Sequence, residues 1–508
     1  MNNRPLLHGL TAFLCGVMVM VLEMTGSRML APYLGTSLIV WTSLIGVVLA
    51  SLSFGYWYGG IIADRFPKTH LLAKIIFAAG LVVALVGGSY TFMLQPLSTG
   101  TLNLYIAALS AAAILFAVPG ALLGMVSPFL ARLAIDNVGS SGRTVGRLYA
   151  LSSLGSILGT FLGGFILVSL LKTGTILFLI AAVLVLVAFF LQCETPPNKG
   201  NKNIPGKKMP NKAAATFFAL LFVGAGGWYH VFGDSLLPEA LHHRDTPYNH
   251  IRVYDSGSLR SYQTDPGLYS QSTIIVGHPE RLASRYFRYV ELAFFYRPDI
   301  RNVAVIGGGG YVLPNYLLAT RPEVAIDVVE IDPGVTAVAR EFFDLKDDSR
   351  LQIFHEDARR FLRRTKNETK KYDLLFGDTF NSHYGVPFHL LTRECLEEIS
   401  HRLSDDGIYM VNIIASAEGP KRKLFEAFHR TLSEVFTSVD VFMVGGPTHG
   451  DNVQNIVLVG FKGKSGFPDS PDAPMDVRQL LNHRWTKPVP QTVPPLRDAL
   501  APVEWYLL

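Results

Sequence analysis

The sequence predicts two parts of different fold class: a multi-pass α-helical membrane domain, followed by a soluble α/β domain with a doubly wound parallel sheet. Three observations predict this division. Long apolar runs fill residues 1–232, and ordinary soluble composition prevails over residues 240–465. From about residue 303, short apolar strands alternate with amphipathic helices, which is typical of a parallel sheet covered by helices. The two parts therefore carry separate structural and functional expectations.

The composition excludes some classes of protein. Hydrophobic residues make up 49% of the 508 residues and charged residues only 17%, below the usual share of about 25%. The formal net charge of +5 is too small to indicate a nucleic-acid partner. The three cysteines, Cys15, Cys193 and Cys395, lie far apart, so they predict neither a disulfide framework nor a metal site. We therefore expect no metal cofactor.

Seven apolar runs are long enough to cross a bilayer, because a span needs about 20 mostly apolar residues. The fourth run contains Pro119 and Pro128, which predict a kink or a break. The first six runs form a predicted membrane domain at residues 1–193, a basic flexible linker follows at 194–212, and a seventh hydrophobic helix lies at 213–235. The runs cover residues 7–31, 37–62, 75–95, 103–133, 146–171, 174–192 and 213–232.

Lysines and arginines gather in alternate short loops, which predicts a cytoplasmic N-terminus. They follow the second, fourth and sixth runs, for example at Arg65, Arg132 and Lys207. We expect a multi-pass protein of the cell (inner) membrane, whose partner is the lipid bilayer. Seven spans would place the C-terminal domain on the outer side, whereas a seventh run that does not cross would leave it in the cytoplasm. The side of that domain therefore stays open.

Two charged residues lie within the first run. Glu23 and Arg28 are five residues apart, so they do not share one helix face. Arg28 is near enough to the end of the run for its side chain to reach the membrane surface. Glu23 has two interpretations: a buried polar contact with another helix, or part of a path for a substrate or a proton.

The predicted strands of the second part end in residues suited to a nucleoside. Ligands of doubly wound sheets bind at the carboxyl ends of the strands. Glycines 307–310 let the backbone approach a ligand closely, and Glu330 can accept hydrogen bonds from ribose hydroxyls. Asp357, before Ala358, either accepts a hydrogen bond from an adenine amino group or caps the next helix. The strands are predicted at 303–308, 325–332, 351–357, 372–378, 407–414, 437–443 and 455–461, and the helices at 311–320, 334–343, 358–365, 392–403 and 418–435.

The motifs GGGG, VVEIDPGV, HEDARRFL and YDLLFGDTF, in this order and spacing, resemble those of the spermidine synthase (polyamine aminopropyltransferase) family. Residues 247–272 resemble the N-terminal β-hairpin region of that family, and residues 285–298 resemble the helix before its first core strand. The resemblance covers about residues 245–445. It implies a Rossmann-like, methyltransferase-type domain at residues 236–465 and a homo-oligomer. By its composition, the segment 466–508 is a Pro-rich C-terminal tail.

The resemblance assigns roles to the strand-end residues. It implies decarboxylated S-adenosylmethionine as the donor and an amine, such as putrescine, as the acceptor, with methylthioadenosine and a longer polyamine as products. Asp378 matches the catalytic aspartate, which takes or orients the proton of the attacking amine. Glu330 would hold the ribose and Asp357 with Ala358 would face the adenine. All the implied cofactor-binding residues are Asn249, Gly307, Gly308, Gly309, Glu330, Asp357, Ala358 and Pro387.

Departures from the family pattern lie in the acceptor half. Gly310 stands where the family has Asp, Asn381 stands where its catalytic loop has a second Asp, and Val290 replaces a histidine. The acidic pair that the family has before its Tyr is replaced around Arg285 and Tyr286. An ammonium in a site without counter-charges costs several kcal/mol, so these losses argue against putrescine. The candidate acceptor contacts are Tyr289, Glu291, Asn381, His383 and Tyr384, with His389 in the same divergent loop.

Three functions follow from these observations. The first is a membrane-anchored aminopropyltransferase-like enzyme that uses Asp378 as proton acceptor. The second is a transferase that uses S-adenosylmethionine itself on another, membrane-associated acceptor, which the missing acids favour. The third is a non-catalytic transporter or sensor with a nucleoside-binding domain. Glu23 favours it, and so does the segment GYWYGGIIADRF, which resembles a turn of the major facilitator transporters. The six-helix count is also similar to half of such a transporter.

Overall fold

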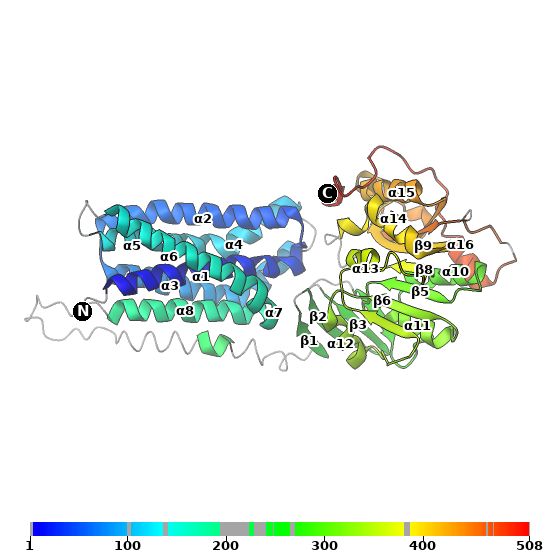
Figure 1. Ribbon diagram of the computed structural model, residues 1–508, viewed down its shortest axis with the longest axis horizontal. Coiled ribbons are helices and arrows are strands. Elements are labelled where there is room, and N and C mark those ends of the chain that lie inside the picture. The colour runs from blue at the N-terminus through cyan, green and yellow to red at the C-terminus, as the bar shows by residue number, and fades with distance from the viewer. Residues whose placement is uncertain are drawn as a thin grey trace, which may run out of the picture. The chain divides into compact units, whose positions relative to one another are not determined.

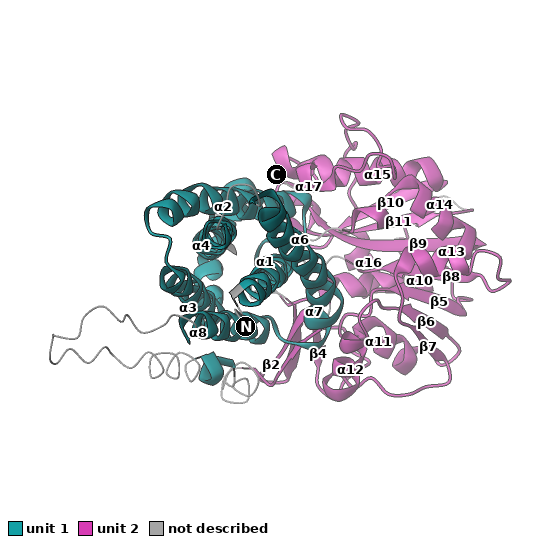
Figure 2. Ribbon diagram, turned by 60° about the vertical axis from the view of Figure 1, so that its left-hand side comes forward, with its two compact units in different colours: residues 1–238 teal, residues 239–508 magenta. Residues whose placement is uncertain are grey.

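The protein divides into two compact units, residues 1–238 and residues 239–508 (Figure 2). The boundary falls close to the change in composition that the sequence predicts. The structure, a computed structural model, describes residues 4–98, 103–135, 141–193, 223–227, 240–246, 248–264, 270–379, 387–463, 466–470 and 472–506.

The first unit contains, among its described residues, six helical stretches long and apolar enough to cross a membrane, and they coincide with the first six predicted spans. The seventh predicted span lies outside the described residues, apart from residues 223–227, which are helical. The fourth stretch breaks at Met125, between its two prolines, as predicted. The helices are α1 (Arg4–Leu34), α2 (Leu38–Arg65), α3 (Thr69–Leu94), α4 (Leu104–Gly124), α5 (Val126–Ala134), α6 (Ser141–Phe161), α7 (Val168–Leu170) and α8 (Thr173–Cys193) (Figure 1).

Glycine allows α6 to pack directly on α1. A Cβ atom at Gly155 would lie 2.1 Å from the backbone oxygen of Phe13, and one at Gly159 would lie 2.4 Å from that of Val17. Small residues at four-residue spacing bring helix backbones together in membranes, where dispersion contacts rather than water drive association. The contact between these two helices therefore depends on the absence of side chains at both positions.

The charged residues of α1 differ in their surroundings. Arg28 donates hydrogen bonds to the backbone oxygens of Val168 and Leu171, the second at 3.1 Å, where the fifth apolar stretch ends. Its guanidinium thus satisfies carbonyl groups at a helix C-terminus, which have no partner within the helix. Glu23 is partly buried on the same helix. The choice between its two interpretations stays a prediction.

The second unit holds two sheets (Figure 1). The smaller is antiparallel and follows chain order: β1 (His242–Asp245), β2 (His250–Ser256), β3 (Leu259–Gln263) and β4 (Ser272–Ile275). The larger has seven strands in the order β10-β11-β9-β8-β5-β6-β7. Its strands are β5 (Asn302–Ile306), β6 (Ala325–Val329), β7 (Leu351–Phe354), β8 (Tyr372–Gly377), β9 (Leu403–Ala415), β10 (Ser438–Met443) and β11 (Gln454–Phe461).

The larger sheet is doubly wound, as predicted, but not wholly parallel. The strands β7, β6, β5, β8 and β9 are parallel, whereas β11 runs antiparallel to both β9 and β10. The reason is the connection between β10 and β11. It is short, with a single 3-10 turn at Pro447–His449 and no α-helix, and a short connection joins antiparallel strands. The expectation of a parallel sheet was therefore wrong for β11, whereas β10 runs in the same direction as β9.

Helices cover both faces of the large sheet. One buried cluster joins the sheet to α10 (Val290–Tyr296), α11 (Val312–Thr320), α12 (Pro333–Phe342) and α16 (Met475–Leu481). The other joins it to α13 (Ala358–Arg364), α14 (Arg393–Arg402) and α15 (Lys423–Val435). The short helix α17 (Val503–Tyr506) belongs to the C-terminal tail. Because sheet strands bury both faces, their apolar runs are nearly continuous.

The close contact between α1 and α6 makes one expected outcome testable. Gly155→Val should lower the free energy of unfolding by about 2 kcal/mol or more, because the neighbouring atom is backbone and cannot rotate away. Gly146→Val, on the same helix, is the matched control, since a Cβ there meets nothing within 4 Å. Thermal unfolding of the purified chain in detergent measures both. Equal melting temperatures for the two variants would contradict the packing.

Candidate active site

The residues that follow four neighbouring strands come together at one edge of the large sheet. Ile306, the last residue of β5, pairs with Val329 on β6 and with Gly377 on β8. Gly307, Glu330 and Asp378 therefore follow strands that end at the same level, and Asp357 lies beyond the adjacent β7. This edge is the place where ligands of doubly wound sheets bind.

The turn after β5 requires glycine at its first position. Gly307 has a φ of +92°, and a Cβ atom there would lie 2.1 Å from the backbone oxygen of Asp378. Its N–H donates to the backbone oxygen of Val329 at 2.9 Å, and the N–H of Asp378 donates to that of Ile306 at 2.8 Å. The backbone after β8 thus packs directly against the backbone after β5. A side chain at Gly307 would separate them.

Glu330 is 7% exposed, and its carboxylate is held by backbone donors. It accepts hydrogen bonds from the N–H of Gly308 at 2.7 Å and from the N–H of Asp332 at 2.8 Å. Burial raises the pKa of Glu330, and these backbone donors oppose part of that rise. The carboxylate therefore lies beside the glycine turn in a fixed orientation, with acceptor capacity for hydroxyl groups.

Asp332 connects the small sheet to this carboxylate. Its side chain is fully buried and accepts hydrogen bonds from Thr246 Oγ1 at 2.6 Å and from Asn249 Nδ2 at 2.9 Å. Thr246 and Asn249 belong to the turn between β1 and β2. Asn249, one of the predicted cofactor contacts, therefore bonds to Asp332, which in turn bonds to Glu330. Sequence reasoning missed both Asp332 and Thr246.

Asp378 is partly buried and is held by two neutral donors. Tyr286 Oη donates to its Oδ2 at 2.8 Å, and Asn412 Nδ2 donates to its Oδ1 at 3.2 Å. Burial raises the pKa of Asp378 to about 6, although both hydrogen bonds act in the opposite direction. The Oδ1 of Asn412 is buried and has no hydrogen-bond partner among the described residues. The Asp378 carboxylate can therefore accept a proton near neutral pH. The Oδ1 of Asn412 beside it is a further hydrogen-bond acceptor.

These contacts come from segments far apart in the sequence. Residues 288–465 match the family model of the Spermine/spermidine synthase domain. The polyamine aminopropyltransferase of Clostridium perfringens (strain 13 / Type A) is 30% identical over 244 residues, which are 46% of this chain and 80% of that protein. The chain belongs to the spermidine synthase family.

Two other relatives match shorter stretches. The polyamine aminopropyltransferase of Vibrio vulnificus is 32% identical over 154 residues, or 30% of this chain and 50% of that protein. The eEF1A lysine and N-terminal methyltransferase homolog of Drosophila melanogaster is 28% identical over 140 residues, or 27% of this chain and 21% of that protein. The chain thus spans about half the length of the first and about a fifth of the second.

In this member of the spermidine synthase family, Asp357 has two partners. Its carboxylate caps α13 by accepting the N–H of Arg360 at 3.0 Å, and its other oxygen lies 3.2 Å from His389 Nε2. Ala358, the next residue, is buried, and Pro387 opens the short helical turn that carries His389. The helix-capping alternative is therefore confirmed, and contact with adenine stays a prediction.

The candidate acceptor residues separate into different places. Tyr289 is buried, and its hydroxyl lies 2.9 Å from Nδ1 of His483, a residue of the C-terminal tail. Glu291 instead forms an ion pair with Arg321 at 2.7 Å and accepts a hydrogen bond from Tyr316 at 2.7 Å. Arg321 follows the C-terminus of α11 and lies at the opposite edge of the sheet from Gly307. Asn381, His383 and Tyr384 lie outside the described residues.

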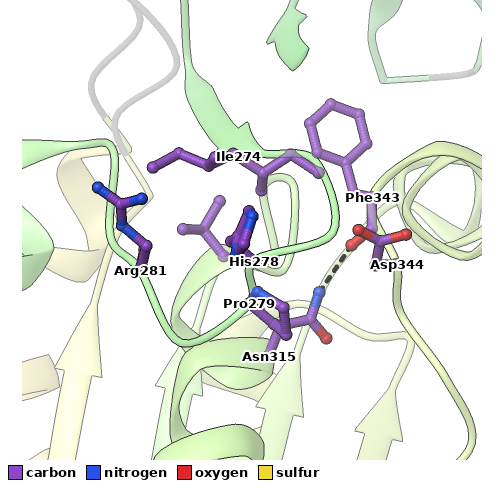
Figure 3. A pocket seen from close by; sticks show the side chains of 9 residues that line it. Ile274, His278, Pro279, Arg281, Asn315, Phe343 and Asp344 are labelled. Carbon is purple, nitrogen blue, oxygen red and sulfur yellow. Dashed lines mark hydrogen bonds between the residues drawn. The ribbon is translucent and has the colours of Figure 1, made fainter. Parts of the chain in front are cut away.

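A separate hollow lies behind the N-terminus of α11 (Figure 3). Ile274, Asn315 and Phe343 line it, and Asn315 Nδ2 donates to the backbone oxygen of Phe343 at 2.7 Å. None of the strand-end carboxylates lines this hollow, so it is distinct from the edge described above.

The raised pKa of Asp378 predicts how the stability of the fold depends on pH. The unfolded chain releases this proton at a lower pH than the folded chain, so stability falls as pH rises from about 4 to about 6. Asp378→Asn removes that cost, and rotation of the Asn412 amide would give the new side chain a hydrogen-bond partner. The variant should therefore melt at a higher temperature than the native chain at pH 8, with a smaller difference at pH 5.

Thermal unfolding at the two pH values measures this difference. Asp405→Asn, at an exposed position outside the candidate site, is the control. A lower melting temperature for Asp378→Asn at pH 8 would show that the carboxylate stabilises the fold instead.

Proposed function

We propose that this chain is a membrane-anchored transferase that moves a propylamine group from decarboxylated S-adenosylmethionine to an amine. The observation that carries the proposal is the convergence of Gly307, Glu330 and Asp378 at one sheet edge in a member of the spermidine synthase family. Relatives in that family are named polyamine aminopropyltransferases.

The nucleoside half of the site would bind the donor. Glu330 would keep its backbone hydrogen bonds and accept two more from the ribose hydroxyls, and the glycine turn would admit the donor close to the backbone. Asp357 with Ala358 would face the adenine, and Pro387 would line the same pocket. Asn249 would approach the thioadenosine from the turn between β1 and β2. The family resemblance in these motifs supports each assignment.

The reaction needs a base but little other chemistry. The amine nitrogen attacks the propyl carbon bound to the sulfonium; a C–N bond forms, the C–S bond breaks, and its electron pair stays on sulfur as the thioether of methylthioadenosine. The amine arrives as an ammonium at neutral pH and must lose a proton before it attacks. Asp378, with a pKa of about 6, would accept that proton. Tyr286 and Asn412 would hold its two oxygens in place.

The acceptor half argues against a diamine. Arg285 stands where the family has acidic residues, and its positive charge lowers the pKa of His483, after the larger effect of burial. A second ammonium group would be repelled by this positive charge. We infer that the acceptor amine has a neutral or anionic far end, which Tyr289 and His483 would contact.

A second candidate is transfer from S-adenosylmethionine itself to another acceptor. One relative, from Drosophila melanogaster, is named a methyltransferase homolog. The nucleoside contacts proposed above serve either donor, since both carry the same adenosyl group. The by-product separates the two: methylthioadenosine for aminopropyl transfer and adenosylhomocysteine for methyl transfer.

We also propose that the six apolar stretches anchor the chain in the cell (inner) membrane with a cytoplasmic N-terminus. Their length and composition support a multi-pass arrangement. Assembly into a homo-oligomer is the expectation for the family. Protease access to residues 240–508 in sealed vesicles would determine the side of the soluble domain.

Product analysis tests the reaction directly. The purified chain, mixed with each donor and a panel of amines, should release methylthioadenosine and favour monoamines or amino acids over putrescine. Asp378→Asn should lower turnover by two or more orders of magnitude, because general-base catalysis contributes about 10²–10⁴-fold. Asp405→Asn is the control. Mass spectrometry that finds neither methylthioadenosine nor adenosylhomocysteine would overturn both enzymatic functions.

The pH dependence tests the role of Asp378 separately. Its carboxylate must be ionised to accept a proton, so kcat/KM should fall about tenfold per pH unit below pH 6. Tyr286→Phe removes a hydrogen bond that lowers the pKa of Asp378, so the falling limb should move to higher pH. Tyr296→Phe, whose hydroxyl bonds to Pro468, is the control. An unchanged limb in Tyr286→Phe would show that another group controls the profile.

A further inference from the structure

Two histidines and an aspartate gather on the small sheet, beside the turn that carries Thr246 and Asn249. His243 and Asp245 lie on β1, and His250 lies on β2. Asp245 pairs directly with His250 in the antiparallel register, and His243 is two residues before Asp245. Directly paired residues and alternate residues of a strand share one face, so all three side chains lie on the same face.

That face is turned away from the hydrophobic core. The opposite face carries Ile251 and Val253, which are fully buried, together with His242, whose ring lies 4.7 Å from that of Phe342. His243, Asp245 and His250 are each partly buried. They are therefore shielded enough to exclude some water and open enough for an ion to enter.

The geometry of the three groups suits a metal ion. One ligand atom from each residue lies within 4.8 Å of the other two. His250 Nδ1 contacts Asp245 Oδ1, and the rings of His243 and His250 are 4.3 Å apart between centroids. Ligand atoms around a tetrahedral zinc ion are about 3.4 Å apart, given metal–ligand distances of about 2.1 Å. Small rotations of these side chains would reach that arrangement.

We propose that His243, Asp245 and His250 bind one divalent transition-metal ion of the zinc type. Two imidazoles favour zinc and its neighbours, whereas magnesium and calcium prefer oxygen ligands throughout. Three protein ligands leave a fourth position for water. The expectation of no metal rested on cysteine spacing, and this group becomes visible only after the β1–β2 register is known.

Arg252 limits the affinity of the site. It pairs with His243 and so lies on the same face, where its positive charge opposes a cation. Asp245 is the one carboxylate among the three ligands. The site should therefore bind zinc less tightly than a structural site with several thiolates.

The position of the site suggests what the ion would do. The turn between β1 and β2 carries Thr246 and Asn249 to the carboxylate of Asp332, which in turn contacts Glu330 through its N–H. A metal bound at the base of this turn would hold the two strands together and fix Asn249. This coupling to donor binding rests on the proposed function, whereas metal binding itself does not.

Zinc titration of the full chain tests the site. The protein, purified in detergent without a histidine tag and stripped with a chelator, should bind one equivalent of Zn²⁺ by calorimetry and none of Mg²⁺. Asp245→Asn and His250→Ala should each weaken zinc binding at least tenfold. His278→Ala is the matched control, because His278 lies 3.0 Å from Glu280 in an exposed pair that has no third ligand in the described chain.

Cobalt provides a check that does not depend on any variant. Co²⁺ bound by two imidazoles and a carboxylate in four- or five-coordinate geometry should give visible absorption bands, which Zn²⁺ should abolish. Absent bands, or zinc affinity that falls as much in His278→Ala as in His250→Ala, would overturn the site and leave adventitious binding only.

Methylthioadenosine affinity separates the coupling from the proposed function. The zinc-loaded chain should bind methylthioadenosine several-fold more tightly than the stripped chain, and His250→Ala should remove that difference. Equal affinity in both states would overturn the coupling alone. No binding in either state would overturn the donor site as well, and the zinc site would then stand or fall by the titration.

Discussion

The close approach of two backbone segments, at Gly307 and Asp378, organises the whole candidate site. Because Gly307 has no side chain, the carbonyl of Asp378 occupies the space where a Cβ atom would be. The same turn presents the N–H of Gly308 to Glu330. One contact thus fixes the distance between the carboxylate proposed to hold the ribose and the carboxylate proposed to accept the proton. The proposed transfer would need both at once, since the sulfonium would lie between them.

The carboxylates of Glu330 and Asp378 have partners of a different kind from those of charged residues elsewhere in the unit. Asp498 and Arg359 form two short hydrogen bonds of 2.6 Å each, and the pKa of Asp498 falls as a result. Among the described residues, no ion pair includes Glu330 or Asp378, whose partners are backbone N–H groups, a phenol and an amide. A cation beside Asp378 would lower its pKa and weaken it as a base. Neutral donors position the carboxylate while burial keeps its pKa near 6.

Residues that end strands could be predicted from the sequence, because strand periodicity and glycines mark where each strand stops. That reasoning located Gly307, Glu330, Asp357 and Asp378 at one edge, and the pairing of β5 with β6 and β8 brings the strand ends together. The partners of these residues could not be predicted, because Tyr286, Asp332 and Asn412 reach the site only through tertiary packing. The direction of a strand could not be predicted from the periodicity either, because β11 proved to be antiparallel to β9.

Helix geometry explains why Glu291 differs from Tyr289. Successive residues of a helix are about 100° apart, so positions separated by two residues point to nearly opposite sides. Tyr289 faces the tail residue His483, whereas Glu291 faces Arg321. The two residues are close together in the family motif. Closeness along a helix does not place two side chains in the same pocket.

The proposed donor and acceptor halves of the site are built from different parts of the chain. The proposed donor half consists of strand ends of the central sheet, whose strands pack against both helical layers. The acceptor half consists of the segment before α10 and the tail, which runs beside β10 through hydrogen bonds of His483 and Trp485 with Met443 and Val441. A peripheral segment can change its side chains without altering the sheet. The structure therefore allows a retained nucleoside donor to coexist with a new acceptor, which is the pattern that Arg285 and His483 suggest.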